Sequence, residues 1–310
     1  MSFNTGTYSG SVVIKPNVAP SSIDGVMTKT PLINAFASLG KLIPTPGSST
    51  FQWNYQFGRD VAASAWTENE AVTAFGSRLY TGASQAAQYK KVPFGISDFQ
   101  MANLENGGLY EDSLAVEREK AAADLLKAYE AVFVGNGASV GISSLIDSTG
   151  TAHGINQSTI SGWASIENTC SGSSFLSVLD DTVSDLSATN ASLTDLVLFM
   201  SPEVFTIYQG LSPSNMRGMY GQSLDLGRAP VDAQSYFNRI PIVVTPGAST
   251  TECYFVDMSD AEIAVHIAPQ VVEVAATNMG KNFVARAAMC LILRDRARHG
   301  KITNIDQRSS

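Results

Sequence analysis

Apolar residues recur in the middle of the chain with the spacing of one helix face. Five of them follow one another at intervals of seven, four, three and four residues: Leu114, Ala121, Leu125, Ala128 and Val132. This spacing gives an amphipathic helix one continuous stripe for packing. Acidic residues crowd its first half, where they favour the positive end of the helix dipole, and a glycine-rich segment follows it. The pattern predicts a helix over 110–134, about 37 Å long.

Two further helices and a buried strand are predicted farther along the chain. Residues 174–186 place their apolar side chains on one side, which is typical of a second amphipathic helix. The continuous apolar run Leu196–Met200 is typical of a buried strand. Ser201 then stands where helix caps are favoured, and Pro202 stands at the first helical position, so a third helix begins there.

The remaining pattern after residue 140 consists of short apolar segments and loops. Residues 141–147 predict a short strand or turn, and residues 211–235 are rich in glycine and methionine and predict loops. The last third of the chain predicts five strands, at 240–244, 253–256, 263–267, 271–275 and 283–294.

A long two-stranded arm is predicted over residues 46–95. Aromatic and amide residues alternate through Phe51–Phe57, which is the period of a strand with one buried face. Residues 88–94 predict the returning strand, and the polar stretch 61–88 lies between the two. The aromatic residues lack interleaved basic residues, so we expect packing and not nucleic-acid stacking. Because an isolated hairpin of this length is marginal in water, we expect neighbouring subunits to hold it.

Composition favours a protein that buries much of its surface against other copies. Only 15% of the 310 residues are charged, whereas about 25% is average for soluble domains. The net charge of −8 argues against a nucleic-acid reader, although a weakly anionic wall would suit a container for nucleic acid. Three cysteines at unrelated spacings indicate reduced thiols. No secretory signal or membrane-spanning stretch is expected, and residues 1–30 predict an extended arm.

The residues that commonly carry catalysis form no recognisable motif here. His153, His266 and His299 are far apart and lack Asp or Cys at ligand spacing, so we predict no metal site. The segment Gly135–Gly141 resembles a dinucleotide loop but follows a helix, so a helix-capping role is expected. A Ser/His/Asp triad built from distant residues stays possible on sequence grounds. The expectation is nevertheless a protein that is not an enzyme and has no cofactor.

The order and spacing of these segments resemble one known family. Ala65–Ala71 and Tyr89–Ser97 are similar to an extended loop that runs into the strand before a spine helix. The helix over 110–134 and the segment 141–145 resemble that spine helix and the turn after it. Leu198–Glu203 and Arg239–Val243 with Cys253–Asp257 resemble axial-domain elements. Together they resemble the Hong Kong 97-like fold of tailed-phage major capsid proteins, over about residues 32–305.

The resemblance implies an α+β fold of this family, with an N-terminal arm, an extended hairpin loop, a peripheral domain with its spine helix, and an axial domain. The expected boundaries are 1–45 for the arm and lead-in, 46–95 for the loop, 96–150 for the peripheral domain, 151–260 for the axial domain and 261–310 for the return strands. It also implies an icosahedral shell of pentamers and hexamers around packaged double-stranded DNA, located in the virion capsid and assembled in the host cytoplasm. Expected partners are other copies of the chain, a separate scaffolding protein, a portal and possible decoration proteins. DNA contact would be independent of base sequence, and no membrane is involved.

Contacts between subunits are expected at charged and aromatic positions. Some family members weld their shells with bonds from a loop lysine, but no lysine lies between Trp66 and Gln88, so a non-covalent shell is expected. The basic end of the chain consists of Arg294, Arg296, Arg298, His299 and Lys301. It predicts either a solvated or salt-bridged face or docking to an acidic face of a neighbour, such as the segment 111–119. The candidate inter-subunit contact residues are Trp66, Glu68, Glu70, Arg78, Lys90, Lys91, Glu117, Arg118, Arg294, Arg296 and Arg298.

Two other functions remain compatible with the pattern. An encapsulin-like bacterial compartment would share the fold and enclose cargo protein instead of a genome. A β-rich enzyme is a more distant alternative, because neither a secretory signal nor a catalytic motif is recognisable.

Overall fold

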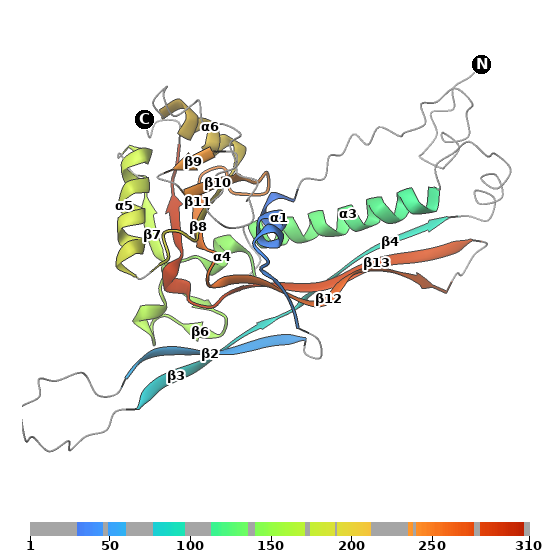
Figure 1. Ribbon diagram of the computed structural model, residues 1–310, viewed down its shortest axis with the longest axis horizontal. Coiled ribbons are helices and arrows are strands. Elements are labelled where there is room, and N and C mark those ends of the chain that lie inside the picture. The colour runs from blue at the N-terminus through green and yellow to red at the C-terminus, as the bar shows by residue number, and fades with distance from the viewer. Residues whose placement is uncertain are drawn as a thin grey trace, which may run out of the picture. The chain divides into compact units, whose positions relative to one another are not determined.

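The computed structural model describes residues 30–45, 49–59, 77–96, 113–135, 140–170, 174–189, 191–211, 235–237, 240–275 and 280–306. The chain divides into two compact units, whose elements are labelled in Figure 1. Described residues of the smaller unit are Thr30 and those from Gln88–Tyr129 and Ile267–Met289. The larger unit takes the rest, from Pro31–Ala87, Glu130–His266 and the chain after Met289.

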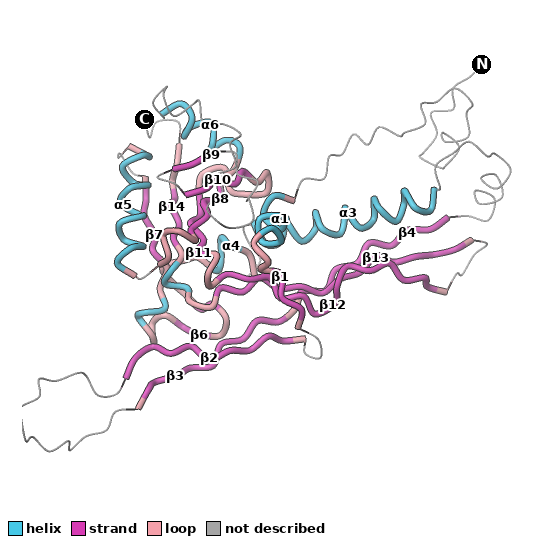
Figure 2. Tube along the Cα trace, in the orientation of Figure 1, coloured by secondary structure: helices cyan, strands magenta, loops and turns pink. Residues whose placement is uncertain are grey.

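The smaller unit combines a long helix with antiparallel strands. Helix α3 (Ser113–Val134) contributes its residues up to Tyr129 and runs alongside strands β4 (Gln88–Ile96) and β13 (Lys281–Leu293), as Figure 2 shows. The two strands pair antiparallel, with Phe94 opposite Phe283. The helix predicted over 110–134 is confirmed from Ser113 onward, and its end at Val134 agrees.

One face of this strand pair packs against α3. On β13, Phe283, Ala285 and Ala287 are buried. The Phe94 and Phe283 rings stack with centroids 5.4 Å apart, and the Arg118 guanidinium of α3 lies 5.1 Å from the Phe283 ring. Small alanine side chains allow a helix to approach a sheet closely, which explains their use on this face.

The larger unit is built on a six-stranded mixed sheet. Its strand order is β7-β14-β11-β8-β10-β9. The bounds are β7 (Ile166–Thr169), β8 (Leu196–Met200), β9 (Ser235–Phe237), β10 (Ile240–Val244), β11 (Cys253–Asp257) and β14 (Gly300–Thr303). Strands β8 and β10 pair in parallel and lie inside the sheet, where every residue of both is buried. The strands predicted at Leu196–Met200 and at 240–244 are both confirmed.

Helices close the core of the larger unit. Helix α5 (Phe175–Ala188) lies against β7 and β14 (Figure 2) and confirms the second predicted helix. Helix α6 (Pro202–Leu211) begins with Pro202, and the Ser201 hydroxyl accepts a bond from the Val204 N–H at 3.2 Å, as the capping pattern predicts. Helix α1 (Pro31–Ser38) contacts β10.

The predicted hairpin exists, but its second strand was assigned to the wrong residues. Strand β2 (Thr50–Arg59) pairs with β3 (Arg78–Ala86), which lies in the stretch that we expected to be a polar connection. The segment 88–94 instead forms β4 and pairs with β13. Apart from Leu79 and Tyr80, the residues of β3 are small or polar, and only two residues of the strand are buried, so the sequence carried little strand signal.

Two other sequence predictions need correction. Residues 141–147 contain a short helix, α4 (Ile142–Leu145), where a strand or turn was expected. The strands expected at 263–267 and 271–275 are one strand, β12 (Ala261–Val274), that runs through Pro269. Strand β1 (Leu42–Pro44) pairs with β12 only as far as Val265, and beyond it the described residues add no strand at that edge. Proline is tolerated at such an open edge because no partner needs its missing N–H.

Short elements complete the larger unit around the hairpin. They are β5 (Thr151–Ala152), β6 (Ile155–Asn156) and the 3₁₀ turns η2 (Ser161–Trp163) and η4 (Arg296–Arg298). Residues 1–29 of the predicted arm and the loop tip at 60–76 lie outside the described residues. The expected domain boundaries stay a prediction.

Candidate assembly surfaces

The inner face of the hairpin is attached to its own subunit. The Tyr55 and Trp163 rings meet edge to face with centroids 4.6 Å apart, and the Tyr55 hydroxyl donates to the Gly162 carbonyl at 3.2 Å. The Trp53 indole N–H donates to the Arg294 carbonyl at 3.2 Å. Burial raises the pKa of Tyr55 to about 12, so its hydroxyl stays a donor at neutral pH. The alternating aromatics therefore anchor the base of the hairpin, as packing was expected to do.

His153 is the most constrained residue at this base. Its Nδ1 atom lies 2.9 Å from Gln85 Oε1, and its Nε2 atom accepts from the Leu293 N–H at 3.3 Å. Its backbone carbonyl accepts from the Ser84 N–H at 2.9 Å. The bond to Nε2 places the proton on Nδ1, so the ring is neutral. Burial, followed by the nearby charge of Arg296, lowers the pKa of His153 to about 3.

The backbone of His153 forms part of a tight turn. His153 and Gly154 connect β5 to β6 with φ of 53° and 82°, and positive φ at two successive residues is the requirement of a tight hairpin turn. A histidine seldom adopts positive φ. The unfavourable backbone conformation of His153 occurs where its side chain joins β3 to β13. We infer that the turn positions the hairpin.

The outer face of the hairpin is open. Gln52, Asn54 and Gln56 are exposed on β2, and Tyr80 of β3 is 54% exposed. Among the described strands, β2 and β3 pair only with each other. Unpaired strand edges and an amide-rich face can accept another chain, and proteins usually cover such edges. The predicted contact residue Arg78 begins β3 and is exposed.

Arg294 uses its charge within the subunit. Its Nε and Nη2 atoms donate to Glu262 Oε1 at 2.9 and 2.7 Å, and its guanidinium lies 5.9 Å from the Phe51 ring. The Arg294 side chain is still 47% exposed, whereas that of Glu262 is 7% exposed. Arg294 therefore ties β2 to β12 and keeps an accessible surface, so its role between subunits stays a prediction.

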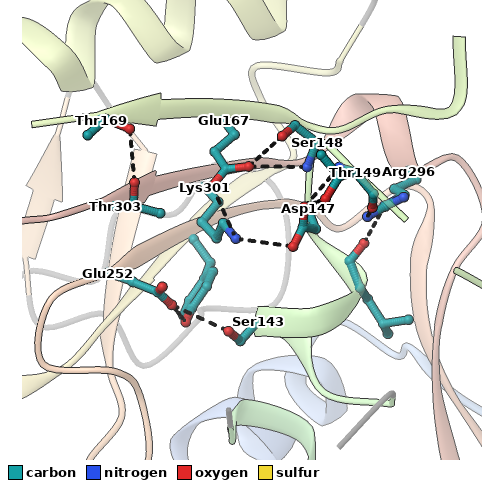
Figure 3. A network of polar contacts seen from close by, with 12 residues as sticks. Ser143, Asp147, Ser148, Thr149, Glu167, Thr169, Glu252, Arg296, Lys301 and Thr303 are labelled. Atoms are coloured by element: carbon teal, nitrogen blue, oxygen red, sulfur yellow. Dashed lines mark hydrogen bonds and ion pairs between the residues drawn. The ribbon is translucent and has the colours of Figure 1, made fainter. Parts of the chain in front are cut away.

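Arg296 and Lys301 of the basic end make polar contacts within the chain, as Figure 3 shows. Arg296 is 1% exposed and donates to the carbonyls of Leu145 at 2.7 Å and Thr149 at 2.8 Å. The Lys301 ammonium lies 3.4 Å from a Glu167 oxygen and 3.7 Å from an Asp147 oxygen. Burial takes Arg296 out of the set of accessible contact residues. Arg296 lies in the 3₁₀ turn η4, and Lys301 lies in β14.

Around Lys301 the polar network continues across several elements (Figure 3). Glu167 of β7 accepts from the Ser148 hydroxyl at 2.6 Å. Glu252 accepts from the Tyr254 and Ser143 hydroxyls, and burial is the main cause that raises the pKa of Tyr254. Every one of these groups has a partner within the chain, so the network stabilises the sheet and its surrounding turns.

Arg298 is the partly accessible member of the basic end. Its side chain is 32% exposed and lies 2.8 Å from Asp260 and 3.3 Å from Asp295. Burial raises the pKa of both carboxyl groups, and Arg298 opposes that rise. Its predicted role between subunits is not tested by these internal contacts.

A buried carboxylate that sequence reasoning missed holds helix α1. Glu130 is 4% exposed and accepts from the N–H groups of Leu32 at 2.8 Å and Ile33 at 3.0 Å. The Thr245 hydroxyl adds a bond at 3.0 Å. Burial raises the pKa of Glu130, while these donors oppose the rise. Glu130 supplies the cap from about a hundred residues away in the chain, so no local capping motif marks it.

The remaining candidates belong to the smaller unit or lie outside the described residues. Lys90 and Glu117 are half-buried, whereas Lys91 and Arg118 are exposed. Their roles between subunits stay predictions. The same holds for Trp66, Glu68 and Glu70, which fall outside the described residues.

Within the described part of the chain, no group of three or more His, Cys, Asp or Glu side chains is arranged to hold a metal ion. The helices that the structure describes include none with the length and apolar character needed to cross a membrane.

The comparison with protein families agrees with this geometry. The family described as the SU10 major capsid protein matches residues 4–306. None of the curated proteins is detectably similar in sequence.

Solved capsid structures share the fold at low sequence identity. The cyanophage A-1(L) capsid chain superposes with a TM-score of 0.75 at 15% identity, covering 93% of this chain and 96% of that one. A chain of the empty GTA particle capsid gives 0.62 at 13% identity, with 96% and 97% covered. The SrpI encapsulin of Synechococcus elongatus gives 0.60 at 10% identity, with 93% of each chain covered. The expected mixed helix and sheet fold of the Hong Kong 97-like type is confirmed.

Proposed function

Because the chain belongs to the SU10 major capsid protein family, we propose that many copies assemble through pentamers and hexamers into an icosahedral shell. The chain is a structural component of a phage capsid, and membership of the family is the reason. The shell would enclose packaged double-stranded DNA without reading its sequence. The net charge of −8 on each chain suits a wall that does not bind the packaged phosphates.

The anchored hairpin carries this proposal. Tyr55 and His153 hold its inner face to the subunit, while Gln52, Asn54 and Gln56 leave its outer face exposed. A hairpin held at one face and open on the other gains stability when a neighbouring copy covers it. If each copy covered the hairpin of its neighbour around every capsomer, this one contact, repeated, would build a closed shell.

We propose that the shell is held together without covalent bonds. The stretch between Trp66 and Gln88 contains no lysine that could attack a neighbouring amide. Strand contacts and ion pairs would then carry the assembly, with a separate scaffolding protein, a portal and decoration proteins as further partners. Assembly would take place in the host cytoplasm, and the family's structural role gives the chain no catalytic task.

An encapsulin-like compartment is the second candidate, because the SrpI encapsulin shares the fold. At 10% identity this likeness concerns the fold alone, whereas the family match points to phage capsids. The contents of the particle separate the two functions. A capsid holds DNA, and a compartment holds cargo protein.

Electron microscopy tests the proposal. The protein should be expressed alone and imaged in negative stain beside particles from lysate of its source. Closed shells or capsomer rings are expected in the first sample, and nuclease-protected DNA in particles of the second. A stable monomer or dimer in both samples would refute the shell, and DNA-free particles with a cargo protein would favour the compartment.

A further inference from the structure

Three buried side chains near the base of the hairpin each have a nitrogen atom without a hydrogen-bond partner. The atoms are Trp163 Nε1, Arg296 Nη1 and His299 Nε2. All three side chains belong to residues that are at most 1% exposed. Almost every buried polar group in a native protein has a partner, and a buried donor left without one costs stability. The three nitrogens therefore need an explanation.

The hydrogen bond at the other ring nitrogen of His299 makes its Nε2 atom a donor. Nδ1 accepts from the Asp257 N–H at 3.1 Å, so the proton of the neutral ring is on Nε2. Burial is the main cause that lowers the pKa of His299 to about 4, which keeps the ring neutral at pH 7. An indole and a guanidinium nitrogen are donors only. All three nitrogens thus offer a proton and call for an acceptor.

Arg296 brings a positive charge whose hydrogen bonds go to neutral groups. Its Nε and Nη2 atoms donate to two backbone carbonyls, at 2.7 and 2.8 Å. Burial lowers the pKa of Arg296, and the charges of Asp147 and Glu167 oppose that fall. Both of those carboxylates lie within 4 Å of the Lys301 ammonium instead. A buried cation bonded only to carbonyls is stabilised by an anion at its remaining nitrogen.

The fold brings the three side chains to one region of the larger unit. The His299 N–H donates to the Arg296 carbonyl at 3.2 Å across the turn η4, and side chains three apart in a 3₁₀ turn lie on the same side. The segment after Trp163 runs beside this turn. The Ser165 hydroxyl donates to the Arg296 carbonyl at 3.0 Å, and the Ile166 N–H donates to the His299 carbonyl at 3.1 Å.

The ring of His153 borders the same region. Its centroid lies 6.5 Å from that of Trp163. Burial lowers the pKa of His153, and the nearby charges of Arg296 and His299 lower it further. Both ring nitrogens of His153 already have partners, so this histidine supplies no acceptor for the three donors.

We propose that Trp163 Nε1, Arg296 Nη1 and His299 Nε2 together bind one small anion of the chloride type inside the larger unit. An anion accepts from all three donors and neutralises the guanidinium. A water molecule accepts two hydrogen bonds and adds two protons that need acceptors of their own. Gln157 Oε1 is a buried acceptor without a partner in the same part of the chain, but an amide oxygen accepts only two bonds.

An anion at this position would strengthen the base of the hairpin. Tyr55 of β2 contacts η2 through the Trp163 ring and the Gly162 carbonyl. An ion that joins Trp163 to η4 fixes the turn on which the hairpin rests. A ligand that binds only the folded chain stabilises it, so the subunit should be more stable in chloride. The site belongs to a single subunit, and the inference does not depend on shell assembly.

Thermal unfolding of the full-length protein in chloride and in gluconate, at equal ionic strength, tests the site. For a dissociation constant of about 10 mM, ~300 mM chloride favours the folded chain about thirtyfold and should raise the melting temperature by roughly 3–5 °C. W163F keeps an aromatic ring but removes the N–H donor, so it should reduce this rise. The matched control W53F removes an indole N–H that donates to the Arg294 carbonyl. It should melt at a lower temperature and keep the full chloride effect.

Crystals of the unassembled protein grown in bromide locate the ion directly. An anomalous scattering peak in contact with the three nitrogens is expected. Equal melting temperatures in chloride and gluconate, or a chloride effect of the same size in W163F, would overturn the inference. A water molecule at this position in the bromide crystals would also overturn it, in favour of a hydrated site shared with Gln157.

Discussion

The imidazole Nδ1 atom of His153 lies 2.9 Å from the side-chain oxygen of Gln85, and both residues are buried at the base of the hairpin. The other ring nitrogen accepts from the Leu293 N–H. A single neutral side chain thus joins the hairpin to the strand that runs beneath it.

Replacing His153 should loosen the hairpin base. H153A leaves the Leu293 N–H and the Gln85 oxygen without partners, and each buried group left unpaired costs about 1–3 kcal/mol. We expect a lower free energy of unfolding in urea and fewer closed shells. The control H153N tolerates positive φ but is too short to bridge both partners, so it separates lost bonds from backbone strain. An unchanged unfolding midpoint for H153A would contradict this role of His153.

Acid should destabilise the subunit through two buried histidines. Burial lowers the pKa of His153 to about 3 and that of His299 to about 4, whereas an unfolded histidine titrates near 6.5. The unfolded chain therefore binds protons first as pH falls. The stabilisation is complete above pH 6.5 and is lost progressively as pH falls through 6.5 toward 3–4, at up to about 1.4 kcal/mol per pH unit for each histidine.

Urea unfolding at pH 7 and pH 4.5 measures this dependence. Burial raises the pKa values of Glu130 and Asp260, which opposes the histidines in acid, so the unaltered protein alone does not isolate one group. The comparison with H153N does. Its unfolding free energy should fall less between the two pH values, and an equal fall would contradict a buried neutral His153.

Glu130 should contribute more to the free energy of unfolding than its position in a long helix suggests. E130A removes the acceptor for the N–H groups of Leu32 and Ile33 and should cost about 1–3 kcal/mol of unfolding free energy. T245V removes only the hydroxyl bond and should cost less. Hydrogen exchange at Leu32 and Ile33 should accelerate in E130A. Unchanged exchange there would show that α1 does not depend on this carboxylate.

Particles should come apart into single chains in denaturant. Because residues 67–87 hold no lysine for a bond between subunits, this chain should run as one gel band at 32.9 kDa when purified particles are heated in detergent. Lys90 and Lys91 are the nearest lysines, and K90R/K91R should leave the pattern unchanged. A ladder of heavier bands that survives denaturation would show covalent joining.

Much of the core was predictable because its signals are local. The uninterrupted apolar runs of β8 and β10 mark strands that are buried on both faces, and the predicted bounds agree with the structure. Ser201 and Pro202 mark the start of α6 by short-range chemistry. In each case the residues that determine the element lie within it or beside it.

The rest depends on contacts between distant residues. Apart from Leu79 and Tyr80, strand β3 is made of small and polar residues, and it pairs with β2 along its length. Arg296 looks like a surface residue until the carbonyls of Leu145 and Thr149 are brought beside it. Glu130 caps a helix about a hundred residues away. Such partners are set by the fold, and no spacing along the chain reports them.

Cryo-electron microscopy of particles from the source organism tests the central claim most directly. The account predicts an icosahedral wall whose repeating unit is this chain, with each hairpin attached to its own subunit through Tyr55 and His153 and covered by a neighbour on its outer face. A wall built from another protein, or a hairpin that leaves its own base to pack entirely on a neighbour, would contradict it.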